Sequence, residues 1–243
     1  MPSTLAKKAR KAGEYVRQLN LVDNCVKMIL KDNVLAVLAN ADLTAVSTAI
    51  YNGGFKKTRT ILNVQVPDEY GDRRLHEDPL NFLKESSKKI GASGEFIGMI
   101  TAAKIANFSA VQKKKGGIGV SVVVTAGCTH AESAGEKIDV QQVEGTINVI
   151  IIVDGNPTES CLVAALATAV EAKAAALRDL DIRSRYTGDV ATGTITDSLV
   201  VAATNNGQLI SYGGPASELG QLVGYCVRKA VKEAVTNQGE CLP

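Results

Sequence analysis

Residues 146–180, TINVIIIVDGNPTESCLVAALATAVEAKAAALRDL, decide the fold class of this chain. The first eight are almost unbroken in apolar character, which is typical of a strand covered on both faces. The segment Asn156-Pro157-Thr158-Glu159 then combines a side-chain acceptor, a preset backbone and a first-turn carboxylate, the signals of a helix start. We expect a helix over residues 157–180. A buried strand followed by a long helix predicts an α/β fold.

Outward from this unit, the sequence alternates between strand-like and helix-like segments. Tyr15, Leu19, Val22 and Val26 recur at helical spacing, so residues 1–31 are expected to form a polar, helical lead-in. Strands are expected over residues 34–39, 96–100, 108–112, 118–125 and 195–203, the last followed by the turn signal Asn205-Asn206-Gly207 and a returning strand at 209–212. Helices are expected over residues 79–90, capped by Asp78, and 215–237.

Two segments carry weaker signals: residues 55–66 are ambiguous, and residues 67–77 are polar and loop-like. No fixed-period repeat or low-complexity linker divides the chain. The prediction is therefore a single α/β domain over residues 32–243, with a mixed β-sheet packed against helices, preceded by the lead-in of residues 1–31.

The composition favours a cytoplasmic protein. Twenty-seven basic and 25 acidic side chains leave a formal charge of +2, which gives no electrostatic reason to expect nucleic acid or an anionic membrane as a partner. The basic run Lys113-Lys114-Lys115 precedes Gly116-Gly117 and is interpreted as an exposed hairpin tip. Five scattered cysteines suggest neither a disulfide framework nor a structural zinc site. The longest strongly apolar segment, taken as residues 146–153, is too short to span a bilayer, and no secretory signal is expected.

Two polar segments follow predicted strands and are candidates for ligand binding. Residues 125–130, TAGCTH, offer close backbone approach at Gly127 and polar contacts from the hydroxyls and His130, although an ordinary turn would look similar. Cys128 and His130 are too few for a metal site. In residues 192–197, TGTITD, alternation would place the threonines on one face and Asp197 on the other, where it could act as a base or be merely solvated.

The long helix carries two charged residues of different character. Lys173 falls on the apolar stripe of the helix, so its ammonium is expected to find a carboxylate, a substrate oxygen or a route to water. Glu171 falls on another face, among small alanines that would allow a large ligand to come close. Residues two apart on a helix do not face each other, so these two side chains are not expected to pair.

Seven blocks resemble the adenosylcobinamide amidohydrolase family, in the order of that family and from about residue 40 to 237. They are Asn52-Gly53-Gly54, Ile61-Leu62-Asn63, GMITAA at 98–103, TAG at 125–127, GTIN at 145–148, Glu171-Ala172-Lys173 and the block 191–197. The resemblance implies hydrolysis of the amide between the corrin propionyl side chain and the aminopropanol linker, giving adenosylcobyric acid and 1-amino-2-propanol. It also implies that cobalt arrives within the substrate, so that the protein requires no cofactor of its own. This chain departs from the family pattern at Thr129-His130, where Ser-Asn is usual, and at Ile195, where glycine is usual.

Amide hydrolysis requires an activated nucleophile, a group that stabilises the oxyanion and a proton for the leaving amine. We assign Glu171 or Asp197 as the base, and Lys173 with backbone N–H groups near Gly127 as the oxyanion stabiliser. A covalent route through Cys128 or a threonine stays open. The expected substrate-binding residues are Asn52, Gly53, Gly54, Asn63, Thr125, Gly127, His130, Asn148, Thr192, Thr194 and Thr196, and no metal ligands are expected.

Three other functions remain as alternatives: a corrinoid-binding protein without hydrolytic activity, an unrelated amidase or transferase, and an interaction module without a small ligand. The last would be marked by an exposed apolar patch. The sequence leaves a homo-oligomer open.

Overall fold

The computed structural model describes residues 9–11, 14–67, 78–92, 94–137 and 145–239. Within these ranges ten strands form one mixed sheet, in the order β1-β2-β3-β4-β13-β10-β8-β7, with β5 joined to β4 and β6 to β5. Its strands are β1 (Ala9–Lys11), β2 (Glu14–Val22), β3 (Val26–Lys31), β4 (Val34–Ser47), β5 (Gly54–Gln65), β6 (Ile97–Thr101), β7 (Ser109–Lys115), β8 (Ile118–Ala126), β10 (Ile147–Asp154) and β13 (Ser198–Ala203). The predicted mixed α/β architecture is confirmed.

Two short ladders and three α-helices complete the described fold. β9 (Ala131–Glu132) pairs with β12 (Gly193–Thr194), and β11 (Asn156–Pro157) pairs with β14 (Leu209–Ile210). The helices are α2 (Pro79–Lys89), α3 (Glu159–Asp179) and α4 (Glu218–Gln238), with a short 3-10 helix η1 at Ile105–Asn107.

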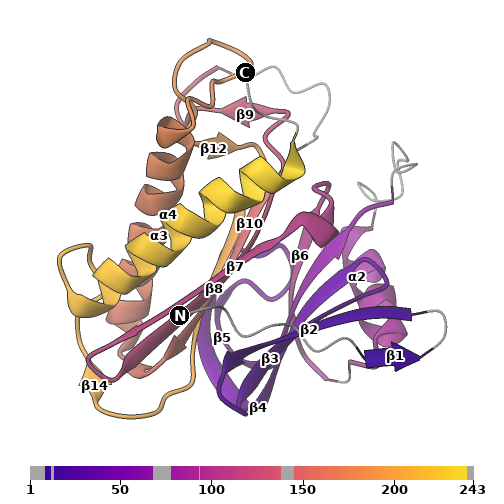
Figure 1. The fold of residues 1–243 in the computed structure, drawn as a ribbon, viewed down its shortest axis with the longest axis vertical. Helices are drawn as coiled ribbons and strands as arrows, with labels where there is room; N and C mark the ends of the chain where they lie inside the picture. Colours follow the sequence, from indigo (N-terminus) through magenta and orange to yellow (C-terminus); the bar gives the residue numbers. More distant parts are fainter. Residues whose placement is uncertain (1–8, 12–13, 68–77, 93, 138–144, 240–243) are drawn as a thin grey trace.

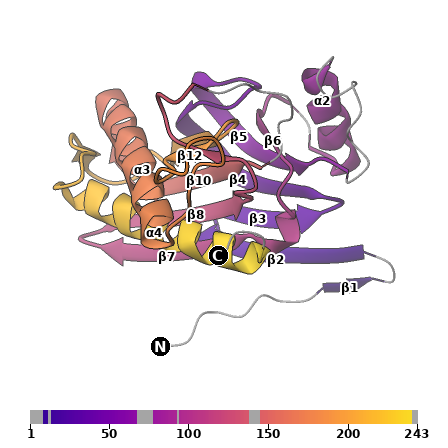
Figure 2. The ribbon, with the colours of Figure 1, turned by 90° about the horizontal axis from the view of Figure 1, so that it is seen from above.

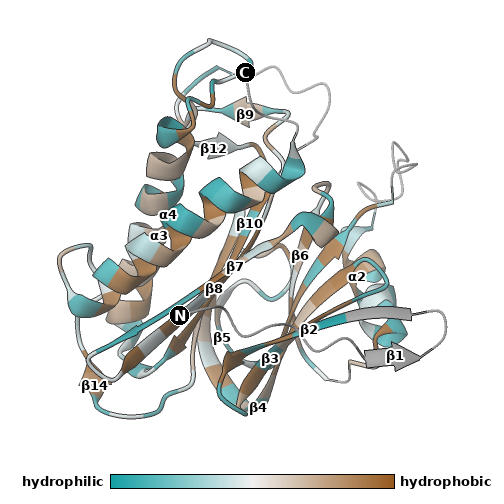
Figure 3. Cartoon of the chain, viewed as in Figure 1, coloured by the Kyte–Doolittle hydropathy of each residue, from teal (hydrophilic) through white to brown (hydrophobic). Residues whose placement is uncertain are grey.

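Helices α3 and α4 lie side by side on one face of the sheet (Figures 1 and 2). Their apolar sides pack against β8, β10 and β13 in the largest core cluster, which includes Val122, Ile151 and Val235. Figure 3 shows hydrophobic residues on the central strands and a mixture of hydrophobic and hydrophilic residues along both helices. The strand of residues 146–153 is therefore covered on both faces, as its composition predicted, since β10 also contributes Ile150 and Ile152 to the core on the other face.

The sheet curls because β4 bends. Between Leu38 and Leu43 the β4–β5 register shifts, so that β4 carries extra residues opposite β5. Such bulges bend a strand and increase its twist. The first half of β4 then pairs with β3 and its second half with β13, while β6 returns toward β10, where Asn148 Nδ2 donates to Ile100 O at 2.9 Å. The nearly closed sheet encloses a second core, which includes Met28, Ile61, Met99 and Ile150.

The helix ends follow the capping chemistry of the sequence, with one correction. Asp78 accepts a hydrogen bond from Asn81 N at 2.9 Å and caps α2, as predicted. The predicted start of the long helix at Asn156-Pro157 is wrong, because these two residues pair with β14 and Thr158 caps the helix instead, accepting from Cys161 N. A threonine hydroxyl in extended backbone is as suitable an N-cap as an asparagine amide.

The helical lead-in is also wrong wherever residues 1–31 are described. They form β1, β2 and β3, and β3 pairs antiparallel with β4. A register shift between Asn20 and Val22 interrupts the alternation of β2, which explains why Leu19 and Val22 mimic helical spacing. Pairing within the sheet overrode the local pattern.

The predicted hairpin after residues 195–203 is wrong as well. Both edges of β13 are occupied, by β10 in parallel and by β4 in antiparallel orientation, so β14 pairs with β11 instead. The strand begins at Ser198, which leaves Ile195 in a turn. The other expected strands and the helix at 215–237 are confirmed, the ambiguous residues 55–66 belong to β5, and residues 68–77 lie outside the described residues.

Helix α3 is long and apolar enough to cross a membrane by length and composition, with a mean hydropathy of 1.5 over 18 residues. The expectation that residues 146–153 form the longest strongly apolar segment is therefore wrong. Half of that window is buried within the fold, and α3 packs against α4 and the sheet. The apolar side of α3 packs in the core, and core packing is a common reason for an apolar helix.

Candidate functional site

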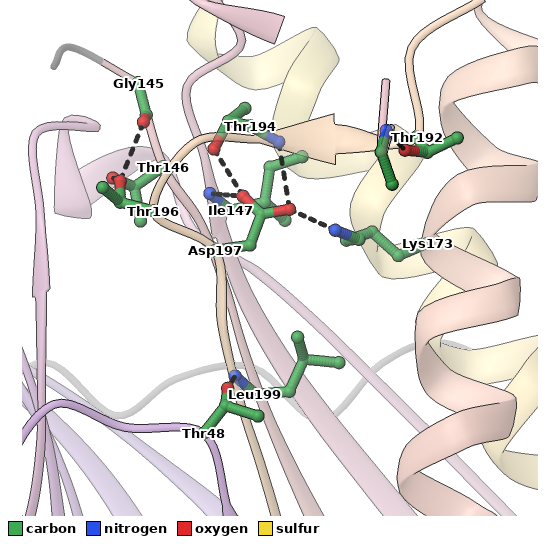
Figure 4. A network of polar contacts seen from close by, with 11 residues as sticks. Thr48, Gly145, Thr146, Ile147, Lys173, Thr192, Thr194, Thr196, Asp197 and Leu199 are labelled. Atoms are coloured by element: carbon green, nitrogen blue, oxygen red, sulfur yellow. Dashed lines mark hydrogen bonds and ion pairs between the residues drawn. The ribbon is translucent and has the colours of Figure 1, made fainter. Parts of the chain in front are cut away.

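A buried ion pair joins α3 to the turn that precedes β13. Lys173 Nζ donates to Asp197 Oδ2, and the two side chains are 8% and 9% exposed. The expected burial of Lys173 is confirmed, and a carboxylate is its partner. Figure 4 shows Lys173 reaching from the helix toward Asp197, at the start of the central strands. Burial of an ion pair is costly unless further hydrogen bonds satisfy the charges.

Asp197 has these further hydrogen bonds. Its Oδ1 accepts from Ile147 N at 2.9 Å and from Thr194 Oγ1, and its Oδ2 accepts from Thr194 N at 3.1 Å as well as from Lys173 (Figure 4). A carboxylate has about four acceptor sites, so the four donors saturate it. Asp197 thus ties together three elements, namely α3, β10 and the turn after β12.

Gly193 makes room for this pair. A Cβ atom at this position would lie 2.5 Å from Asp197 Oδ2 and 2.5 Å from Lys173 Nζ, closer than real Cβ contacts. The glycine in the TGTITD block is therefore explained by close approach of the ion pair to the backbone.

The threonines of this block do not share one face, contrary to the expectation. Because the chain turns at 195–196, Thr194 and Asp197 face each other instead of lying on opposite faces. Thr196 Oγ1 lies 2.7 Å from Thr146 Oγ1, and Thr192 Oγ1 accepts from Ala134 N (Figure 4). The three hydroxyls hold three different segments.

A second polar network lies on the inner face of the curled sheet. Asn63 Nδ2 donates to Thr125 Oγ1 at 2.8 Å, and Asn148 Nδ2 donates to Asn63 Oδ1 at 2.8 Å. These side chains are almost fully buried, and among the described residues neither Asn148 Oδ1 nor Ser198 Oγ has a hydrogen-bond partner. Asn148 and Ser198 are adjacent across the β10–β13 ladder. Buried polar atoms are normally paired, so this position is suited to a ligand or a water molecule.

The two networks meet through the loop after β8. Gly127 N donates to Thr146 O at 3.1 Å, and a Cβ atom on Gly145 would press against Gly127 O and the backbone nitrogens of Thr129 and His130. His130 is buried and its Nε2 lies 2.9 Å from Arg185 Nη1. Six of the seven blocks therefore converge at one end of the sheet: those from β5, β6, β8, β10 and β12–β13, together with the block of α3 that contains Lys173.

The sequence profile described as adenosylcobinamide amidohydrolase matches residues 18–243. The chain belongs to the adenosylcobinamide amidohydrolase family. An adenosylcobinamide amidohydrolase of Methanosarcina mazei is 28% identical over 220 residues, which cover 87% of this chain and 98% of that protein. An adenosylcobinamide amidohydrolase of Halobacterium salinarum is 26% identical over 204 residues, which cover 79% of this chain and 80% of that protein. A solved structure from Pyrococcus horikoshii, 15% identical, covers 97% of this chain and 82% of that chain, but its TM-score of 0.42 is too low to carry an argument.

Membership in the amidohydrolase family makes this protein an enzyme and extends the resemblance to residue 18. The matched residues therefore include β3 and the part of β2 from residue 18 onward, although the sequence blocks begin only near residue 40.

Not every residue expected at the amidohydrolase site lies in these networks. Asn52 and Gly53 directly precede β5 and Gly54 is its first residue, and Asn52 Nδ2 donates to Phe96 O at 2.9 Å. Glu171 is exposed and lines an open groove of about 590 Å³ between α3 and α4, on the outer side of the helix. The structure thus brings Lys173 together with Asp197 and leaves Glu171 apart from them.

Residues that the sequence reasoning missed include Glu132, Arg185 and Ser198. Glu132 and Arg185 lie in stretches to which no element or role was assigned, and Ser198 lies inside a predicted strand. The only sequence signal was that Glu132 follows the TAGCTH segment by two residues. Within the described ranges, no three His, Cys, Asp or Glu side chains gather as metal ligands.

Proposed function

We propose that this amidohydrolase cleaves the amide joining the aminopropanol linker to the corrin propionyl side chain of adenosylcobinamide. The products would be adenosylcobyric acid and 1-amino-2-propanol. Family membership supports the substrate class, since the family and two relatives carry the name adenosylcobinamide amidohydrolase. The observation that carries the proposal is the buried Lys173–Asp197 pair, which lies where the sequence blocks that resemble the family meet.

In this proposal Lys173 stabilises the tetrahedral oxyanion. An ammonium has three donors, and Asp197 accepts one of them, which leaves two for a substrate oxygen. The carboxylate keeps the ammonium in place before the reaction begins, so that no reorganisation is needed as negative charge develops. The N–H of Gly127 donates to Thr146 O, so Lys173 takes the larger share of this role.

Asp197 acts in this proposal as the residue that positions Lys173. Its four hydrogen bonds occupy its acceptor sites, and accepting a proton from water would require it to release one of them. Glu171 as the base stays a prediction, and retention of turnover in Glu171→Gln would remove it from the mechanism.

The inner network is proposed to bind the polar periphery of the corrinoid. Amides need both donors and acceptors, and Asn148 Oδ1 and Ser198 Oγ, which have no hydrogen-bond partner among the described residues, offer these. Asn63 and Thr125 hold the Asn148 side chain in orientation.

The test is incubation of the purified protein with adenosylcobinamide, with mass spectrometry of adenosylcobyric acid and free aminopropanol. Wild type should produce both in equal amounts, and Lys173→Met should lose turnover while Lys115→Met, on the exposed β7–β8 hairpin, should retain it. Corrinoid binding by the wild type without release of aminopropanol would contradict hydrolysis.

We also propose that cobalt enters only with the substrate, that the enzyme acts in the cytoplasm, and that neither nucleic acid nor a membrane is its partner. Protein treated with a chelator and then dialysed should retain full turnover if no resident metal is required.

A further inference from the structure

Glu132 lies directly opposite Gly193 in the β9–β12 ladder. Residues directly opposite in an antiparallel pair project to the same side, with Cβ atoms about 5 Å apart. A Cβ atom on Gly193 would point at Asp197 Oδ2 and Lys173 Nζ, 2.5 Å from each. The side chain of Glu132 therefore leaves the ladder on the side of the Lys173–Asp197 pair, and Gly193 places no side chain between them.

The charges around Glu132 are consistent with this placement. Partial burial raises the pKa of the Glu132 carboxyl, and the negative charges of Asp197 and Glu136 raise it further, while Lys173 lowers it. The loop that packs on β9, through Arg185 N and Ala131 O, carries the Arg185 guanidinium against His130. A carboxyl with a raised pKa is better suited to exchange protons in hydrolysis than an ordinary one.

Glu132 differs from Asp197 in having its acceptor sites available. Among the residues that the structure describes, none donates a hydrogen bond to the Glu132 carboxylate, whereas Asp197 accepts four. The two carboxylates thus have separate environments beside one ammonium, an arrangement typical of sites where one carboxylate moves protons and the other holds charge.

We propose that Glu132 is the general base and acid of the hydrolysis, a proposal that rests on the function proposed above. Water attacks the amide carbon as its proton passes to the Glu132 carboxylate, and the carbonyl oxygen becomes an oxyanion beside Lys173. When the C–N bond breaks, the Glu132 proton passes to the departing nitrogen, which leaves as the amine. The second proton of the attacking water remains on the new carboxylic acid, so atoms and charges balance.

The test is the pH dependence of adenosylcobinamide turnover in wild type, Glu132→Gln, Glu132→Asp and the control Glu136→Gln. Because the base must be deprotonated, kcat of the wild type should fall as the pH falls through the pKa of Glu132. Glu132→Gln should lose at least about 100-fold in kcat with little change in KM. Its kcat should also no longer show the fall at low pH, which is the acidic limb of the wild-type profile. Glu132→Asp, whose carboxylate is withdrawn by one methylene, should recover part of the rate and the limb.

Glu136→Gln is the matched control because Glu136 lies four residues away and holds Ser184 and Thr187 by hydrogen bonds. Its plateau kcat should stay near that of the wild type, and its acidic limb should move to lower pH because a negative charge near Glu132 is removed. Wild-type turnover with Glu132→Gln equally active would overturn the role of Glu132 and leave the proposed function intact. A wild type that releases no aminopropanol would overturn the proposed function itself. Circular dichroism of each variant separates loss of chemistry from loss of fold, and the limb shift in Glu136→Gln tests the proposal without changing Glu132.

Discussion

Replacing Lys173 with methionine tests how much the buried ion pair contributes to the stability of this enzyme. Methionine retains the apolar stem that packs on the core side of α3 and removes the ammonium. Removing one partner of a buried pair typically costs 3–5 kcal/mol, because an uncompensated charge is left behind. Asp197 would keep its hydrogen bonds from Ile147 N and from both Thr194 donors, so we expect the lower end, about 3 kcal/mol.

Urea unfolding at pH 7 measures this loss. The chain has no tryptophan, so far-ultraviolet circular dichroism is the suitable signal. With a denaturant slope of about 2 kcal/mol per molar, the midpoint should fall by roughly 1.5 M urea. The control Lys115→Met, at an exposed position, should stay within about 0.5 kcal/mol of the wild type.

A double-mutant cycle with Asp197→Asn isolates the interaction. An amide at this position would point N–H donors at the existing donors, so the single variant should also be destabilised. Because the two side chains touch, the two losses should not add, and we expect a coupling energy of about 2 kcal/mol. A cost below about 1 kcal/mol for Lys173→Met would refute the reasoning, because it would mean that the pair is solvated.

Three further predictions concern other positions. Gly193→Ala should destabilise the fold by about 1–3 kcal/mol, because the new methyl group must separate the ion pair, whereas Gly214→Ala, which meets no atom within 4 Å, should be nearly neutral in the same urea assay. Hydrogen bonds from the basic side chains of α4 lower the pKa of Asp179 to about 2. The stabilising contribution of Asp179 should therefore be present above about pH 4 and be lost as the pH falls toward 2. In thermal unfolding, Asp179→Asn should show a smaller loss of stability than the wild type across that range. Burial raises the pKa of Cys226 to about 11, so alkylation at pH 8 followed by peptide mass spectrometry should modify the exposed Cys25 and spare Cys226 until the protein is unfolded; rapid labelling of Cys226 in the folded protein would contradict its burial.

Local patterns predicted the elements of the fold where the signal lay within one element. Asp78 and Pro79 marked the start of α2, and the apolar run of residues 146–153 marked a strand covered on both faces. The patterns failed where pairing between elements decided the outcome. The register shift in β2 made strand residues mimic a helix, and the occupied edges of β13 excluded the hairpin that Asn205-Asn206-Gly207 suggested.

The candidate site was predictable residue by residue but not as an arrangement. Helical spacing alone placed Lys173 on the buried side of its helix, and the expectation that it needs a partner followed from the cost of burying a charge. The sequence did not reveal that Asp197 is saturated with donors, because the turn at 195–196 reverses the direction in which its side chain points. Nor did it reveal Glu132, whose importance comes from its position opposite Gly193.

By itself, the sequence determined the family, the α/β class and the burial of Lys173, since motif order, hydrophobic period and capping residues are local properties of the chain. Only the tertiary structure decided which side chains meet. Lys173 and Asp197 are 24 residues apart, and Asn63 and Asn148 are 85 apart. The hydrophobic period of a segment indicates which of its faces is buried. The element that covers that face depends on how the whole sheet curls, which cannot be predicted from any one segment.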